Sequence, residues 1–299
     1  MQSSRLEVTG VEAGCVVSAA RQAHGSNFAL KLLRRRRCFL EHHEYDPYEA
    51  YEAYDSSEAY NPETFVSGKS FESTLGSLGT VLLQRPGTLV VNKPSGTSSE
   101  DFVNLMEVAL AVPLVAVSRL DHPTSGVLPL ATGSRIQWLK AQFAGRLVVK
   151  KYLCLCQGPA LGPVGHTGRL AQRLRPATSA RTEVSCWGKE ALTIFRVVAR
   201  YADGMDGLDG MELIQLQVQP VTGRKHQIRA HLANIGRPVV GDRKYGGYGR
   251  GRRSDFPMSR LFLHCGYLKF FDLQGEEVIV EAPLPADLRN ILRNLKPKY

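Results

Sequence analysis

Asp121 is the residue of this 299-residue sequence that is best placed to do chemistry. It follows an apolar run, Val108–Val117, which is too short to span a membrane. The dipeptides His122-Pro123 and Ser125-Gly126 disfavour a regular helix or strand, so we expect Asp121 on a loop at the end of a buried element. A rigid scaffold can aim a carboxylate from such a loop at a substrate. On spacing alone, however, a structural role as a turn residue or an Asx cap before Thr124 is favoured.

A family resemblance changes this interpretation. The stretch RLDHPTSGVLPLA, residues 119–131, resembles the RLDxxTSGLLLLA signature of the RluA-type pseudouridine synthases. Further stretches are similar to the same family in the same order, and together they cover residues 89–295. They are VVNKPSG (90–96), KKYL (150–153), TGRKHQIRAHL (222–232), IGRP (235–238), VGD (240–242), LHCGYLKF (263–270) and EAPLPADL (281–288).

The resemblance implies an α+β catalytic domain, with a mixed, mainly antiparallel central sheet flanked by helices and loops and an active site in a cleft across it. The irregular alternation of predicted helices and strands also favours α+β. The implied reaction converts specific uridines of structured RNA, ribosomal or transfer, to pseudouridine. Asp121 would attack covalently, at the base or at the ribose carbon, and no metal or other cofactor is implied.

Two further catalytic residues follow from the resemblance. Tyr152 would stack on the target uracil, although a strand tyrosine is common in any sheet. Arg229 lies beside an apolar helix stripe, so it should be partly buried and in need of an anion, and Asp121 is its natural partner. Such a pair keeps the aspartate ionised, as a nucleophile requires.

The predicted RNA contacts come from several stretches. Arg119 could enter the space left by a flipped-out nucleotide, and Arg224 could bind phosphate or form a structural ion pair. The loop GGYGRGRR, residues 246–253, could follow an RNA backbone or be a solvated insertion. His226 and two other histidines, His231 and His264, occupy family positions outside the chemistry and are not expected to bind metal. The complete predicted set is Arg119, Arg224, Lys93, Lys151, His226, Arg250, Arg252 and Arg253.

Hydrophobic periodicity predicts the elements that must position these residues. Strands are expected over 88–92, 127–131, 150–156, 190–201 and 213–221, with a loop over 203–210. A helix over 133–146 would bury Ile136, Leu139, Phe143 and Leu147. A second helix would follow Thr222-Gly223 and stop at Gly236.

Three departures from the family pattern support an alternative. Ser118 replaces a usual histidine, Pro129 replaces an aliphatic residue, and the connection over 97–117 is short. Since proline removes a ladder donor, Pro129 predicts an edge or bulged strand. The alternative is an inactive RNA-binding protein that retains the fold. An aspartate-nucleophile hydrolase is a third class, but no phosphate-binding loop or metal-acid cluster is visible.

The charge distribution indicates a polyanionic partner. The net charge is +10, and it is concentrated in residues 146–299, where 25 basic and 13 acidic residues give +12; residues 1–145 have 13 and 15, giving −2. RNA is the favoured partner over a membrane surface, and a monomer is expected. The six cysteines lack paired metal-binding spacings, and Cys154 and Cys156 should be reduced core residues on one face of a strand.

The chain is divided into two parts by composition. Residues 1–72 form a basic N-terminal segment and an acidic, tyrosine-rich linker, both expected to be disordered, and residues 73–299 form the catalytic domain. The basic start, including Arg34–Arg37, is typical of import into a mitochondrion or plastid, but equally of a basic tail of a cytoplasmic or nuclear protein.

Overall fold

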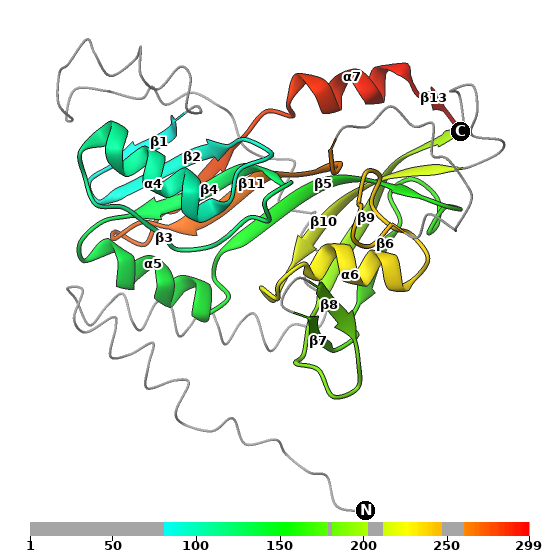
Figure 1. The fold of residues 1–299 in the computed structure, drawn as a ribbon, viewed down its shortest axis with the longest axis horizontal. Coiled ribbons are helices and arrows are strands. Elements are labelled where there is room, and N and C mark those ends of the chain that lie inside the picture. The colour runs from blue at the N-terminus through cyan, green and yellow to red at the C-terminus, as the bar shows by residue number, and fades with distance from the viewer. Residues whose placement is uncertain (1–80, 179–180, 203–211, 247–259, 299) are drawn as a thin grey trace, which may run out of the picture.

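The computed structural model describes residues 81–178, 181–202, 212–246 and 260–298 (Figure 1). The predicted N-terminal segment lies outside the described residues, so its boundary at residue 72 stays a prediction. The same is true of the predicted loop over 203–210 and of Arg250, Arg252 and Arg253.

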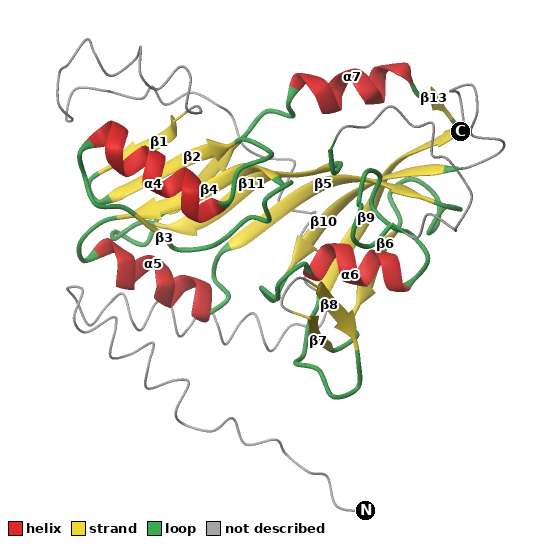
Figure 2. Ribbon diagram, in the orientation of Figure 1, coloured by secondary structure: helices red, strands yellow, loops and turns green. Residues whose placement is uncertain are grey.

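The described chain is a mixture of helices and strands (Figure 2). The helices are α4 (Ser99–Leu110), α5 (Arg135–Ala144), α6 (Gln227–Asn234) and α7 (Ala286–Asn294). The strands are β1 (Val81–Arg85), β2 (Thr88–Lys93), β3 (Val115–Ala116), β4 (Ser125–Ala131), β5 (Val149–Gln157), β6 (Thr167–Leu170), β7 (Leu174–Thr178), β8 (Arg181–Val184), β9 (Thr193–Ala202), β10 (Leu213–Pro220), β11 (Leu263–Phe271), β12 (Glu277–Glu281) and β13 (Lys296–Pro297).

One mixed sheet organises these elements. Within the described residues its strand order is β1-β2-β4-β11-β5-β10-β9-β13, with β3 on β4, β6 on β9 and β12 on β11. The pairs are antiparallel, except that β4 and β11 pair in parallel through two residues each. The predicted α+β class, with a mainly antiparallel sheet, is confirmed.

The sheet has two halves that meet at β11. Helices α4 and α5 pack against β3 and β4 in one half, at the left of Figure 1, while α6 packs against β8, β9 and β10 in the other. The β7–β8 hairpin projects from this second half, below α6 in the view of Figure 1. Asp121 and Arg229, described below, come from different halves.

Side-chain burial explains why these segments form these elements. All seven residues of β4 are buried, whereas β12 alternates between exposed and buried positions, as expected for a strand with one solvated face. Helix α4 buries Phe102, Val103 and Met106 on one side, and its N-cap Ser98 accepts the backbone N–H of Asp101. Each large apolar side chain buried in this way contributes roughly 2 kcal/mol.

The buried face of α5 differs from the predicted stripe. Trp138, Leu139 and Gln142 are buried, while Ile136 and Phe143 are only partly covered. Gln142 can be buried because its amide satisfies both the carbonyl and the N–H of Phe271, at 2.8 Å each. Two hydrogen bonds across the sheet thus turn a polar residue inward, which hydrophobicity alone does not predict.

The apolar run before Asp121 is not the buried element that we expected. Val108, in the last turns of α4, is 84% exposed, and the chain then turns at Ala111 into the short strand β3. Leu114 is the well-buried residue of this stretch. The short connection is therefore filled by a helix and a strand of two residues.

Pro129 lies on an internal strand, so the predicted edge position is wrong. It pairs with Val90 of β2, and its carbonyl accepts the N–H of Val117 on the other side at 3.2 Å. On that second side β4 pairs with β11 only at Ser125 and Gly126 and with β3 only from Leu130 onward. The missing donor therefore falls between two short pairings, where the ladder does not need it.

Candidate active site

The backbone around Asp121 is held by the turn that follows β2. The N–H of Gly96 donates to the carbonyl of His122 at 2.9 Å. The hydroxyl of Ser95 donates to the carbonyl of Pro123 at 2.8 Å. The loop is therefore fixed on a rigid element, and 24% of the Asp121 side chain is still exposed, so a substrate can reach it.

Arg229 contacts Asp121 from the other half of the sheet. This arginine is on α6 and is 3% exposed, and its Nη1 donates to Oδ2 of Asp121 at 3.0 Å. Its Nε and Nη2 donate to the two oxygens of Asp242, at 2.7 and 2.8 Å. Burial opposes the charge of Arg229, but the hydrogen bonds and charges of Asp242 and Asp121 outweigh it and raise the pKa of the guanidinium. The predicted Asp121–Arg229 pair is confirmed.

The side chain of Gln227 folds the turn that leads into α6. Its Oε1 accepts the N–H of Arg224 at 3.0 Å and the hydroxyl of Thr222 at 2.7 Å. Its Nε2 donates to the carbonyl of Leu192 at 2.9 Å, just before β9. Because these bonds anchor the first turn of α6 on the sheet, the buried face of the helix carries Arg229 toward Asp121.

Tyr152 lies on the face of β5 that is turned toward Asp121. It is 6% exposed, and burial, followed by Cys265 and the charge of Asp121, raises the pKa of its phenol well above 10. The ammonium of Lys150 lies 5.7 Å from the centre of the Tyr152 ring. Burial lowers the pKa of Lys150, and Cys265 and Asp121 oppose this shift. Tyr152 is thus kept as a protonated aromatic side chain beside the candidate nucleophile.

His226 is part of the surroundings of Asp121 rather than of an exposed RNA-binding surface. It is 8% exposed, and its Nε2 lies 3.8 Å from Oδ2 of Asp121. Its Nδ1 shares a hydrogen bond of 3.0 Å with the hydroxyl of Tyr245. Burial lowers the pKa of His226, and the charge of Asp121 opposes this. His226 therefore lies beside the candidate nucleophile, whereas the resemblance implied a position outside the chemistry; its backbone has φ = 53°.

Lys93 is fully buried and supports the turn after β2. Its Nζ donates to the carbonyls of Pro94 and Thr97, at 2.7 Å each. Burial lowers its pKa to about 8, against the opposing charge of Asp121. Its hydrogens serve the turn that holds the Asp121 loop, so the predicted contact of Lys93 with RNA is not what the structure shows.

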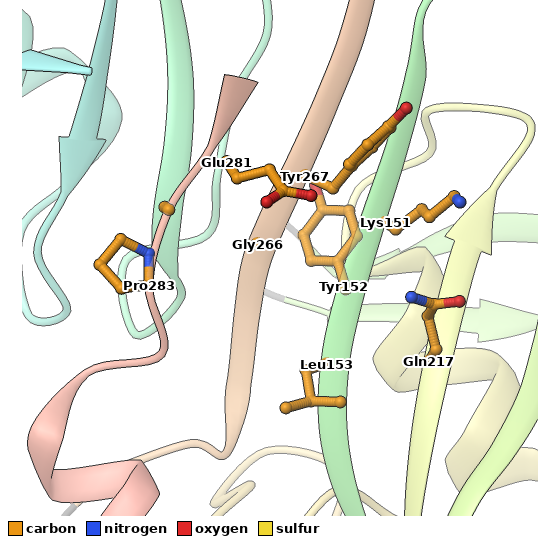
Figure 3. Close-up of a pocket in the computed structure, with 9 residues that line it drawn as sticks. Lys151, Tyr152, Leu153, Gln217, Gly266, Tyr267, Glu281 and Pro283 are labelled. Carbon is orange, nitrogen blue, oxygen red and sulfur yellow. The ribbon is translucent and has the colours of Figure 1, made fainter. Parts of the chain in front are cut away.

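Lys151 lies on the opposite face of the sheet from Asp121. Consecutive residues of a strand point to opposite faces, and Lys150 and Tyr152 lie on the face near Asp121. The Lys151 ammonium lies 4.8 Å from the centre of the Tyr267 ring. Both residues line a hollow of about 420 Å³ (Figure 3), whose wall also includes Gln217 and Glu281. Lys151 therefore lies away from Asp121, and its predicted contact with RNA stays a prediction.

The two remaining predicted RNA contacts within the described residues are exposed, as an RNA-binding role requires. Arg119 pairs with Glu100 at 3.1 Å, with 73% of its side chain exposed. The Nε of Arg224 donates to the carbonyl of Glu190 at 3.0 Å. The side chain of Arg224 thus contacts a backbone carbonyl, whereas Arg229 contacts Asp121 directly.

Sequence reasoning missed three neighbours of the site: Asp242, Tyr245 and Lys150. A signal for Asp242 was present, because a buried guanidinium has more donors than one exposed carboxylate can satisfy. For Lys150, the strand period of two indicates that only one of Lys150 and Lys151 lies on the same face as Tyr152. No sequence pattern indicated Tyr245, whose hydroxyl accepts the N–H of Thr182 at 2.8 Å.

Several other groups have purely structural surroundings. His231 bonds to Thr193 and to the Gln172 carbonyl, and His264 bonds to Ser125 and to the Ala282 carbonyl. Cys154 and Cys156 are buried side by side and unbridged, with their sulfurs 3.8 Å apart, as predicted. Among the described residues no group of three His, Cys, Asp or Glu side chains could hold a metal. In the same ranges no helix has the length and hydrophobicity to cross a membrane.

The arrangement of the strands and helices is that of pseudouridylate synthases. Two solved human structures share it. RNA Pseudouridylate Synthase Domain Containing 1 has a TM-score of 0.61 and 24% identity, covering 78% of this chain and 92% of the other. For RNA Pseudouridylate Synthase Domain Containing 4 the TM-score is 0.58, the identity 22%, and the coverage 77% and 98%.

Sequence relatives define the family. The RNA pseudouridylate synthase family model matches residues 87–234. Ribosomal large subunit pseudouridine synthase C of Escherichia coli is 32% identical over 231 residues, which are 72% of this chain and 70% of the relative. Synthase D of Xylella fastidiosa is 34% identical over 230 residues, 72% and 66%. The chain belongs to the RluA-type pseudouridine synthase family. It spans about two thirds of the length of these relatives.

Proposed function

We propose that this protein isomerises specific uridines to pseudouridine in structured RNA, ribosomal or transfer, with Asp121 as the nucleophile. The observation that carries the proposal is the 3.0 Å contact between Nη1 of Arg229 and Oδ2 of Asp121, two residues that come from different halves of the sheet. The buried guanidinium of Arg229 holds one oxygen of this partly exposed carboxylate in place, as a positioned nucleophile requires. Family membership supports the same reaction class.

The reaction requires one bond to break and another to form at the same ribose carbon. The bond from that carbon to the base nitrogen breaks, the base rotates, and the ribose rejoins it at carbon 5, which loses its proton. Asp121 forms the transient covalent bond, either to the base or to the ribose carbon. The buried ring of Tyr152 offers a flat apolar face for the uracil, and its raised pKa keeps the phenol protonated.

Arg119 is proposed as an RNA contact that acts before this chemistry. A base within an RNA helix must leave its stack to reach Asp121. Arg119 is two residues before Asp121 and its side chain is 73% exposed, so its guanidinium is available to fill the vacated space or to bind a phosphate.

The test is Asp121→Asn, which preserves size while removing the charge and the nucleophile. Tritium release from carbon 5 of labelled uridine in RNA should stop, while RNA affinity, measured on the same preparation, should stay within a few-fold of the wild type. The reason for this split is that affinity comes mainly from phosphate contacts elsewhere. An active Asn variant would contradict the nucleophile assignment. A wild-type protein that binds RNA but releases no tritium from any cellular RNA would favour a non-catalytic binding protein.

A further inference from the structure

Asp242 divides the guanidinium of Arg229 between two carboxylates. Asp242 accepts Nε and Nη2 in a bidentate pair at 2.7 and 2.8 Å, which leaves Nη1 for Asp121. The planar guanidinium has no freedom to rotate once two of its nitrogens are fixed on one carboxylate. The direction of Nη1 is therefore set by Asp242.

The backbone in turn fixes Asp242, which is 1% exposed. Its Oδ1 also accepts the N–H groups of Lys244 and Tyr245, at 3.0 Å each. The preceding Gly241 has φ = 74°, and a Cβ there would lie 2.1 Å from the carbonyl oxygen of Arg260. Only glycine allows this close approach, so the turn holds the carboxylate in one place.

The same turn controls a second contact with Asp121. It places the hydroxyl of Tyr245 on Nδ1 of His226, whose Nε2 lies 3.8 Å from Oδ2 of Asp121. Arg229 also contacts Oδ2. Both contacts converge on one oxygen of the nucleophile, and Arg229 leaves Oδ1 free of its guanidinium.

We infer that Asp242 is a positioning residue, which acts through Arg229 to hold Asp121 by Oδ2 and to present Oδ1 for attack. Without the Asp242 charge, Arg229 could rotate and pair with both oxygens of Asp121, which would occupy the attacking atom. This inference rests on the proposed function, because it assigns a role in the same reaction.

The first measurement is single-turnover and steady-state tritium release for Asp242→Asn. We expect kcat to fall at least tenfold while KM and RNA affinity change less than about threefold. Asp242→Glu, which restores a carboxylate, should recover part of the loss. The matched control is Asp272→Asn. Asp272 likewise accepts two backbone N–H groups, those of Gln274 and Glu276, and a hydrogen bond from Arg85, but it lies far from the site. The kcat of the Asp272→Asn variant should therefore be unchanged.

A double-mutant cycle separates positioning from a general structural role. If Asp242 acts through Arg229, adding Asp242→Asn to Arg229→Gln should change kcat less than about twofold, since the intermediary is already gone. The double variant also removes both buried charges, so it should fold even if Asp242→Asn alone does not. An equal loss in both backgrounds, or a kcat of Asp242→Asn within twofold of the wild type, would overturn the inference. A wild type without tritium release would instead overturn the proposed function.

Discussion

The hydroxyl of Ser99 acts as a backbone partner for Leu120, the residue just before the candidate nucleophile. It donates to the Leu120 carbonyl at 2.9 Å and accepts the Leu120 N–H at 3.0 Å. Ser99 is 1% exposed, and Leu120 is 5% exposed. One side chain in the first turn of α4 therefore satisfies both polar groups of a buried peptide segment that belongs to no strand.

Replacing this hydroxyl should loosen the Asp121 loop. Ser99→Ala would leave two buried backbone groups without a partner, at a cost of about 2 kcal/mol in the free energy of unfolding. Turnover should fall as well, because the loop then has alternative conformations. The control is the adjacent Ser98→Ala, which removes an exposed helix cap worth about 1 kcal/mol and should leave kcat intact. Urea unfolding and tritium release check both variants; equal turnover in the two would argue against the role of Ser99.

The pH dependence of stability should reveal the buried ammonium of Lys93. Its pKa is lowered from 10.5 to about 8 in the folded protein, so between these values the unfolded chain binds more protons. Stability must then rise with pH across this window. Relative to Lys93→Met, the wild type should gain at most about 3 kcal/mol between pH 8 and 10.5. Chemical unfolding of both proteins at several pH values measures this gain.

RNA binding should depend steeply on salt. Each phosphate that the basic residues of 146–299 neutralise releases counterions, so affinity for RNA should fall at least about tenfold between 50 and 200 mM salt. Arg119→Gln should weaken binding and reduce the salt slope by about one. The control is Arg85→Gln. Arg85 is also a surface arginine in an ion pair, with Asp272 at 3.1 Å, and it lies at the far end of the sheet. Affinity that is independent of salt would contradict an electrostatic interface.

Removal of residues 1–72 should leave folding and turnover on a purified RNA intact. The described strands begin at Val81, and the family resemblance begins at residue 89. The truncated protein should therefore unfold cooperatively and release tritium at the rate of the full chain. A loss of folding would show that the domain boundary lies earlier.

Sequence patterns predicted most of the elements because each has one dominant period. The strand over 150–156, the alternating strand over 213–221 and the helix after Thr222-Gly223 are all present as β5, β10 and α6. The Asp121–Arg229 pair was also predictable, since a buried arginine requires an anion. These predictions depend on local sequence or on a strong physical requirement.

The remaining features depend on which segments meet in space. Lys93 and His226 were predicted as RNA contacts, yet both are buried: Lys93 donates to carbonyls of the turn that follows it, and His226 bonds to the hydroxyl of Tyr245. The strand period shows that Lys150 and Lys151 point to opposite faces of the sheet, but it does not show which face is near Asp121. The position of Pro129 depends on how far β3 and β11 extend along β4, which no local pattern records.

The parallel pairing of β4 and β11 has a consequence for the order in which the protein can assemble. Strand β11 lies between β4 and β5 in the sheet, although both are made long before it. On a growing chain, the half that carries Asp121 and the half that carries Arg229 and Asp242 share no pairing among the described strands until residues 263–271 emerge. Contacts over such long sequence separations form slowly. Because β11 joins the halves into one sheet, the two halves can fold before Asp121 and Arg229 are held together.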